Sequence, residues 1–141
     1  MNKKTTQFRW MLTMLMLVVA MPTFAGLQSY DSNGFGSDGS YQPATLTTGK
    51  YDINGDGTKD DVYEISNAGQ LYWFAGLVNG TLTDGTSQNT YANAVLVSDI
   101  TVNSGVLKAD GTLRDDPSGL RSWTPIGNFE NSTLRRFLGF F

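Results

Sequence analysis

The sequence contains no cysteine and no histidine, and these two absences exclude several kinds of site. A Ser-His-Asp triad, a cysteine nucleophile, a thiolate or imidazole zinc site and a disulfide scaffold would each lack an essential residue. Proline is scarce, at 4 of 141 residues, and charged residues make up only 16% of the chain. Glycine, at 16 residues, exceeds its usual share of about 7%. The composition therefore indicates a turn-rich β protein, in which carboxylate chemistry or hard-cation binding remains open.

The first 25 residues have the features of a secretory signal peptide. Three basic residues lie within the first nine positions, and an uncharged apolar stretch then leads to Pro22-Thr23-Phe24-Ala25. The stretch holds about 12 to 15 apolar residues, fewer than the roughly 20 that a spanning helix needs. We therefore expect cleavage after Ala25, no membrane span in the cleaved chain, and a secreted or cell-surface location.

Charge argues against nucleic acid as a partner. Cleavage would remove three of the ten basic residues and none of the 13 acidic ones, which leaves 7 basic and 13 acidic side chains and a net charge of −6. Such a protein repels phosphate backbones. The 116 residues that remain are enough for a single hydrophobic core.

The region after the signal peptide divides into a polar segment and a patterned one. Residues 26–49 are rich in Gly, Ser, Thr and Asp and show no apolar period, which predicts a linker. Val62-Tyr63-Glu64-Ile65 predicts a short strand, and the β-branched residues between Ala94 and Val102 predict a longer one. Residues 81–91 and 107–120 are polar and rich in turn residues, so we expect loops there.

A single amphipathic helix is predicted between these strands. Its apolar face is defined by residues spaced at i, i+3, i+4 and i+7, namely Leu71, Phe74, Ala75 and Val78. Ser66 and Asn67 are candidates for the N-cap, and Gln70 follows Asn67 at the spacing of a capping box. Asn79-Gly80 provides the expected end of the helix.

An acidic loop within residues 50–64 has the ligand spacing of a calcium site. The sequence from Asp52 to Asp60 follows the pattern D-x-N-x-D-G-x-x-D, in which alternate side chains converge on one ion. The predicted ligands are side-chain oxygens of Asp52, Asn54 and Asp56, the backbone carbonyl of Thr58, and Asp60 directly or through water. Calcium is the only cofactor that the sequence predicts.

The residues on either side of this loop narrow the type of calcium site. The twelfth position, where an EF-hand has a bidentate glutamate, is Tyr63, and Glu64 comes one residue late. No helical pattern precedes Asp52, so a non-helical calcium loop is favoured over an EF-hand. The alternative is an Asp/Asn/Gly turn between strands that binds no ion.

Several segments, in the same order, resemble one family of exported proteins. The matching residues are Tyr63-Glu64-Ile65-Ser66, Gly69-Gln70-Leu71-Tyr72-Trp73-Phe74-Ala75, Val78-Asn79, Ala94-Val95-Leu96, Asp99-Ile100, Trp123-Thr124-Pro125-Ile126-Gly127 and Phe137-Leu138-Gly139-Phe140-Phe141. This set, over about residues 51 to 141, resembles the opening module of bacterial exported right-handed β-helix proteins, which include GLUG-repeat, haemagglutinin-like and adhesin-like surface proteins. In that family the last motif continues into D-G-x-G-H and stacked coils.

The resemblance implies a fold and a role. The fold would be mainly β with one amphipathic helix, in which residues 65–141 form the N-terminal cap and the incomplete first coil of a right-handed parallel β-helix. The alternative is a small α+β domain that uses the same helix face for ordinary core packing. The role would be that of an exported, non-catalytic, calcium-stabilised N-terminal fragment of an adhesin-like surface protein, whose partners are host or cell-surface glycans or proteins.

A second function, from another class, is also open. Right-handed β-helices include polysaccharide lyases and hydrolases, so the chain could instead belong to a secreted calcium-dependent polysaccharide-active enzyme or a carbohydrate-binding module. The adjacent carboxylates Asp60-Asp61 and Asp115-Asp116 are candidates for acid and base. Neighbours on a strand point to opposite faces, however, and a solvated turn explains the second pair better. We therefore expect no catalysis.

Overall fold

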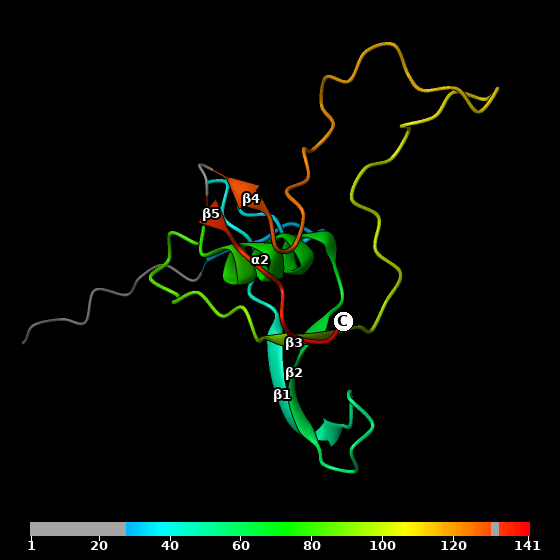
Figure 1. Cartoon of the computed structure of the whole chain (residues 1–141). Helices are drawn as coiled ribbons and strands as arrows, with labels where there is room; N and C mark the ends of the chain where they lie inside the picture. Colours follow the sequence, from blue (N-terminus) through cyan, green and yellow to red (C-terminus); the bar gives the residue numbers. More distant parts are fainter. Residues whose placement is uncertain (1–27, 131–132) are drawn as a thin grey trace, which may run out of the picture.

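The computed structural model describes residues 28–130 and 133–141 of the chain, shown in Figure 1. The elements, in order, are β1 (Thr45–Tyr51), β2 (Asp60–Ile65), α2 (Ala68–Asn79), β3 (Asn93–Leu96), β4 (Phe129–Glu130) and β5 (Thr133–Leu134). Three strands form an open sheet in the order β1-β2-β3, and β4 and β5 form a separate two-stranded pair. The expected signal peptide over residues 1–25 lies outside the described residues.

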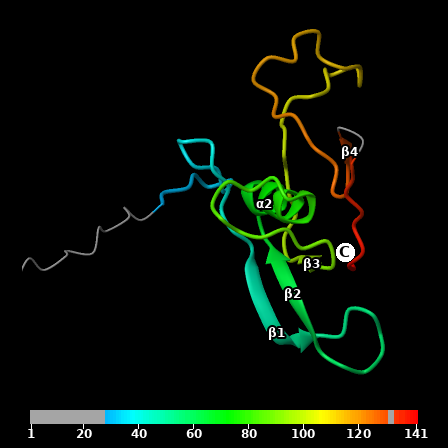
Figure 2. The same cartoon turned by 60° about the vertical axis from the view of Figure 1, so that its left-hand side comes forward.

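The sheet combines a hairpin with a parallel crossover. β1 pairs with β2 in antiparallel register, with Thr45 opposite Glu64, and the register shifts between Thr47 and Tyr51. β2 and β3 are parallel, and the helix α2 lies in the connection between them (Figure 2). Parallel neighbours require such a crossover, and a helix within it covers the sheet.

The C-terminal segment lies along the open side of β3 without forming a strand. The backbone N–H of Leu138 donates to Thr90 O at 2.8 Å, and Ala94 N–H donates to Phe140 O at 2.9 Å. Because residue 138 contacts residue 90 and residue 140 contacts residue 94, the segment runs in the same direction as β3. Asn93 adds a side-chain bond, in which its Oδ1 accepts from Phe140 N–H at 3.0 Å. The last residues of the chain therefore lie along the outer edge of β3.

The helix begins and ends where the sequence predicts. Asn67 is the N-cap, and its side chain accepts from the backbone N–H of Gln70 at 2.9 Å. Gln70 reaches back to Ser66 rather than to Asn67, because its Oε1 accepts from Ser66 N–H at 2.8 Å. Gly80 closes the helix in the left-handed conformation, with φ 66°. Glycine adopts this conformation without the strain that a Cβ would cause.

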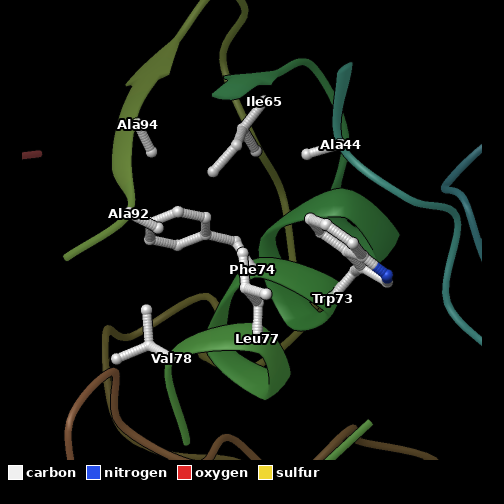
Figure 3. Close-up of a cluster of buried hydrophobic side chains, with 8 residues drawn as sticks. All are labelled: Ala44, Ile65, Trp73, Phe74, Leu77, Val78, Ala92 and Ala94. Carbon is white, nitrogen blue, oxygen red and sulfur yellow. The ribbon is translucent and has the colours of Figure 1, made fainter. Parts of the chain in front are cut away.

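The burial of α2 differs from the one-sided pattern that we expected. Eleven of its twelve residues are buried, and Leu71, which we predicted on the buried face, is only partly buried. One side packs in the main core, made of Ala44, Ile65, Trp73, Phe74, Leu77, Val78, Ala92 and Ala94 (Figure 3). Another side joins Phe35 in a second cluster with Ala68 and Tyr72. The helix is thus enclosed by distant segments, which helical periodicity alone does not reveal.

Two segments differ from what their local patterns indicate. Within residues 28–49, where a linker was expected, Phe35 is 6% exposed, Tyr30 bridges to Gly36, and β1 begins at Thr45. Phe35 and Tyr41 contact Tyr72 of α2, far along the chain, so no local period marks them. The strand predicted up to Val102 ends at Leu96, and the remaining residues enter a long loop.

At the coarse level the predicted fold class is confirmed. The described residues are mainly β with one helix, arranged as a small open sheet. No stack of β-helix coils is present among them, and the arrangement agrees with the alternative of a small α+β domain.

Candidate functional sites

The acidic loop is the turn of the β1-β2 hairpin. It occupies residues 52–59 and is closed by the pairing of Tyr51 with Asp60. Figure 1 shows it at the end of the hairpin that points away from α2. Gly55 and Gly57 have φ of 76° and 87°, so the tight winding of the loop uses the two positions where a side chain would be strained. The sequence pattern and the strand pairing together place all the predicted ligands in one exposed loop.

Asp52 organises the first half of the loop. Its Oδ1 accepts from Gly55 N–H at 2.8 Å, and its Oδ2 accepts from Gly57 N–H at 2.9 Å. Both bonds draw the backbone around the carboxylate. A carboxylate oxygen has two lone pairs, so each oxygen of Asp52 keeps one for another donor or a cation.

Asn54 and Asp56 organise the second half. Asn54 Oδ1 accepts from Asp56 N–H at 2.9 Å, and Asp56 Oδ1 accepts from Thr58 N–H at 2.7 Å. The bond from Thr58 lowers the pKa of Asp56, which keeps this carboxylate charged. Asn54 Nδ2 also donates to Asp56 Oδ2 at 3.1 Å. If an ion bound in the loop, this last bond would break, because the Asn54 side chain would turn to direct its amide oxygen at the ion.

Asp60 closes the acidic loop, and its side chain reaches back to the loop backbone. It is the first residue of β2, and its Oδ2 accepts from Ile53 N–H at 3.0 Å. Within the part of the chain that the structure describes, no three Asp, Glu, His or Cys side chains are grouped closely enough to hold a metal ion. The loop thus brings Asp52, Asn54, Asp56 and Thr58 into one hydrogen-bonded turn. Its oxygen donors suit a hard cation such as calcium.

Glu64 is engaged at the base of the hairpin. Its Oε1 accepts from Lys50 Nζ at 2.6 Å and from the hydroxyl of Tyr51 at 2.8 Å. The bond to Lys50 is the main cause that lowers the pKa of Glu64. This arrangement commits the nearest glutamate to the strand pair rather than to the acidic loop.

The second pair of adjacent carboxylates lies in an exposed turn. Asp115 forms an ion pair with Lys108 at 2.8 Å, and its side chain is 89% exposed. Asp116 Oδ1 accepts from Ser118 N–H at 2.8 Å, as in a local Asx turn. Asp115 and Asp116 therefore form contacts within their own loop, as in the solvated turn that the sequence indicates for this pair.

The aromatic residues of α2, which could stack on a sugar ring if exposed, are packed inside. Tyr72 is 9% exposed, contacts Trp123 at 5.2 Å between ring centroids, and donates from its hydroxyl to Ser122 O at 2.7 Å. Trp73 is 5% exposed and packs on Tyr63 at 5.4 Å. Tyr72 thus joins α2 to the loop at residues 122–123, and Trp73 joins it to β2.

The structure also contains a cavity that the sequence did not predict. It has a volume of about 330 Å³ and lies between residues 28–41 and the loop after α2. The residues that line it include Tyr30, Asp38, Tyr41, Trp73, Leu82 and Asp84. The two loops come from opposite sides of the helix in sequence, so no spacing pattern relates their side chains.

Comparisons with known proteins place no further constraint on these sites. No family model matches the chain, and no curated protein and no solved structure is significantly similar to it. Over residues 28–130 and 133–141, no helix is long and apolar enough to cross a membrane.

Proposed function

We propose that the chain is an exported, non-catalytic, calcium-stabilised N-terminal module of an adhesin-like surface protein, in which it caps a parallel β stack. In this role the helix and the loops around it close one end of a hydrophobic core, and the sheet continues in parallel coils. Calcium in the acidic loop would hold the β1-β2 hairpin, and host or cell-surface glycans or proteins would be the partners.

The observation that carries this proposal is the parallel growth of the sheet. β3 lies parallel to β2, and residues 138–140 follow β3 in the same direction. Solenoids grow by such repeated parallel pairing, and each new coil covers the apolar surface of the one before. Phe140 and Phe141 are 50% and 53% exposed at this edge, so apolar surface is present where a further coil would pack.

The helix supports the same role from the other side. Phe74 is fully buried between the helix and the sheet, and its ring contacts Phe137 at 6.2 Å and Phe141 at 5.8 Å between centroids. The residue at the centre of the core therefore touches the segment from which the sheet would continue. A cap needs this contact because its core must pack directly against the first coil.

Thermal unfolding with calcium and with chelator tests the calcium part of the proposal. At a calcium concentration about ten times Kd, binding adds about 1.4 kcal/mol to the free energy of unfolding, which raises Tm by roughly 5 °C. Asp56→Ala removes a predicted ligand and should abolish this difference. Asp110→Ala is the matched control, because Asp110 accepts from Thr112 N–H in an equivalent Asp-Gly-Thr turn elsewhere.

Three results would contradict the proposal. An equal Tm in calcium and chelator would remove the ligand assignment. Hydrolysis or cleavage of pectin-like or glucan substrates by the purified chain, lost in Asp115→Asn, would favour the polysaccharide-active enzyme. If the coding sequence after Phe141 encoded no parallel coil, the proposed capping role would be wrong.

A further inference from the structure

The cavity beside α2 has two walls that each present a fixed carboxylate. On the first wall, Gln28 Nε2 donates to both oxygens of Asp38 at 3.0 Å and to Ser40 Oγ at 2.8 Å. Ser40 N–H donates to Asp38 Oδ1 at 3.0 Å. The Ser40 hydroxyl is the main cause that lowers the pKa of Asp38, to about 2, so this group is charged at neutral pH.

The second wall presents Asp84 from the loop that follows α2. Its Oδ1 accepts from Thr86 N–H at 2.8 Å, and its Oδ2 lies 3.5 Å from the indole nitrogen of Trp73. The Thr86 hydroxyl is the main cause that lowers the pKa of Asp84. Both walls therefore offer charged acceptors whose orientation is set by bonds from the protein itself.

The cavity also has apolar lining, and it has no basic lining residue. Tyr41 and Leu82 are partly buried and contribute a ring and methyl groups between the two walls, and Trp73, which is 5% exposed, contributes only a small part of its indole. The indole of Trp73 is held in place because it packs against Tyr63. No lysine or arginine is among the described residues that line the cavity. An anionic ligand would meet two carboxylates and no positive charge, which disfavours it.

We propose that this cavity binds one neutral sugar unit of a glycan. The hydroxyl groups of a sugar are hydrogen-bond donors that fit the two carboxylates, and its C–H surface fits the apolar lining. The volume is at the lower end of the roughly 300–1,000 Å³ typical of ligand sites, which suits a single ring rather than a long chain. The proposal gives a ligand class to the surface role argued above and rests on that role, but it does not depend on calcium in the β1-β2 loop.

Calorimetric titration of the purified chain with methyl glycosides of glucose, galactose and mannose tests the proposal. At least one glycoside should bind saturably and change tryptophan fluorescence, because Trp73 lines the cavity. Glucuronate should bind at least tenfold more weakly than methyl glucoside. Asp84→Asn and Asp38→Asn should each weaken binding at least tenfold, because an amide is a weaker acceptor for a hydroxyl group.

Asp110→Asn is the matched control for Asp84→Asn. Asp110 occupies a second Asp-Gly-Thr turn of the same kind, accepts from Thr112 N–H at 2.9 Å, and does not line the cavity. The affinity of the Asp110→Asn variant for the glycosides should equal that of the wild type. An equal loss in Asp110→Asn would attribute the effect to general loosening of turns and overturn the proposal.

Other outcomes would overturn the sugar site without touching the calcium proposal. These are no saturable binding of any neutral glycoside, tighter binding of glucuronate, or displacement of the glycoside by ethylammonium at equal concentration, which would identify a site for amines. In each case the calcium-dependent Tm measured on the same preparation shows whether the β1-β2 loop still binds its ion.

Discussion

At the scale of single residues, Asn79 illustrates how one polar side chain joins distant segments. It ends α2 and is only 1% exposed. Its Nδ2 donates to Pro125 O at 2.9 Å, and its Oδ1 accepts from Gly127 N–H at 2.9 Å. From the sequence, Asn79 was predicted only as part of a helix stop. Its link to Pro125 and Gly127 joins positions that are 46 and 48 residues apart in the sequence, which no local pattern indicates.

Replacing Asn79 therefore should cost more than replacing an ordinary surface asparagine. In Asn79→Ala, the carbonyl of Pro125 and the N–H of Gly127 lose their partner beside a buried helix end. We expect the free energy of unfolding to fall by about 1–3 kcal/mol, the cost of one unsatisfied buried group, because Pro125 is exposed and its carbonyl can bond to water whereas Gly127 is partly buried. Urea denaturation at neutral pH measures the difference.

Asn89→Ala is the control for this change. Asn89 is exposed and its side chain accepts from Tyr91 N–H at 3.0 Å in a local turn, so its replacement should cost less than about 1 kcal/mol. If both variants lost the same stability, the link from the helix end to residues 125–127 would contribute nothing beyond a turn bond.

The acidic loop marks what a residue pattern does predict. The spacing of Asp52, Asn54 and Asp56 led to a wound turn, and the structure has each of these side chains accept from the backbone within the loop. Asp60, the last predicted ligand, begins β2 opposite Tyr51, and its Oδ2 accepts from Ile53 N–H at 3.0 Å, so its side chain also contacts the loop. The spacing thus predicts the winding of the turn, and calcium binding by these residues stays a prediction.

At the scale of elements, the ends of α2 were predictable and its surroundings were not. Capping chemistry acts within four residues, so Asn67 and Gly80 identify the helix from sequence alone. The burial of Trp73 and Leu77, off the predicted face, depends on loops that arrive from both ends of the chain. β1 was missed for a related reason, because its residues are mostly exposed and show no apolar alternation.

For two glycines of α2, helix propensity predicts that alanine would stabilise the protein, whereas packing predicts that it would destabilise it. Alanine is favoured over glycine by about 1 kcal/mol in a helix interior. At Gly69, however, a Cβ would lie 1.8 Å from the backbone oxygen of Gly34, while Gly69 N–H donates to Asn33 O at 2.7 Å. Gly69→Ala should therefore lower the free energy of unfolding, by about 1–3 kcal/mol, because backbone must move.

Gly76→Ala is the comparison within the same helix. There a Cβ would meet the Cδ2 atom of Leu82 at 2.6 Å, the far end of a flexible side chain. Leu82 is only partly buried and is able to turn aside, so we expect a change smaller than that of Gly69→Ala. Chemical denaturation of the two variants ranks them, and the reverse order would show that residues 33–34 yield more easily than Leu82.

At the scale of the whole molecule, the sheet is covered unevenly. The inner face of the sheet packs on α2, where Ile65, Phe74 and Ala94 are fully buried. The outer edge of β3 is lined by the C-terminal segment, in which Leu138, Phe140 and Phe141 are 45%, 50% and 53% exposed. The position of this segment beside β3 was not predictable from the sequence, because it depends on contacts with residues 90–94 far along the chain.

An apolar sheet edge of this kind should make the isolated chain associate with itself. Exposed edges recruit further strands unless charge or a bulge protects them, and no charged side chain lies within residues 137–141. We expect the weight-average mass in sedimentation velocity to rise with concentration for the wild type and to remain that of a monomer for Phe140→Lys. Leu107→Lys is the matched control, since Leu107 is 59% exposed on a turn away from the sheet. If the wild type stayed monomeric, or if Leu107→Lys suppressed association equally, the C-terminal segment along β3 would not present the surface on which a parallel stack continues.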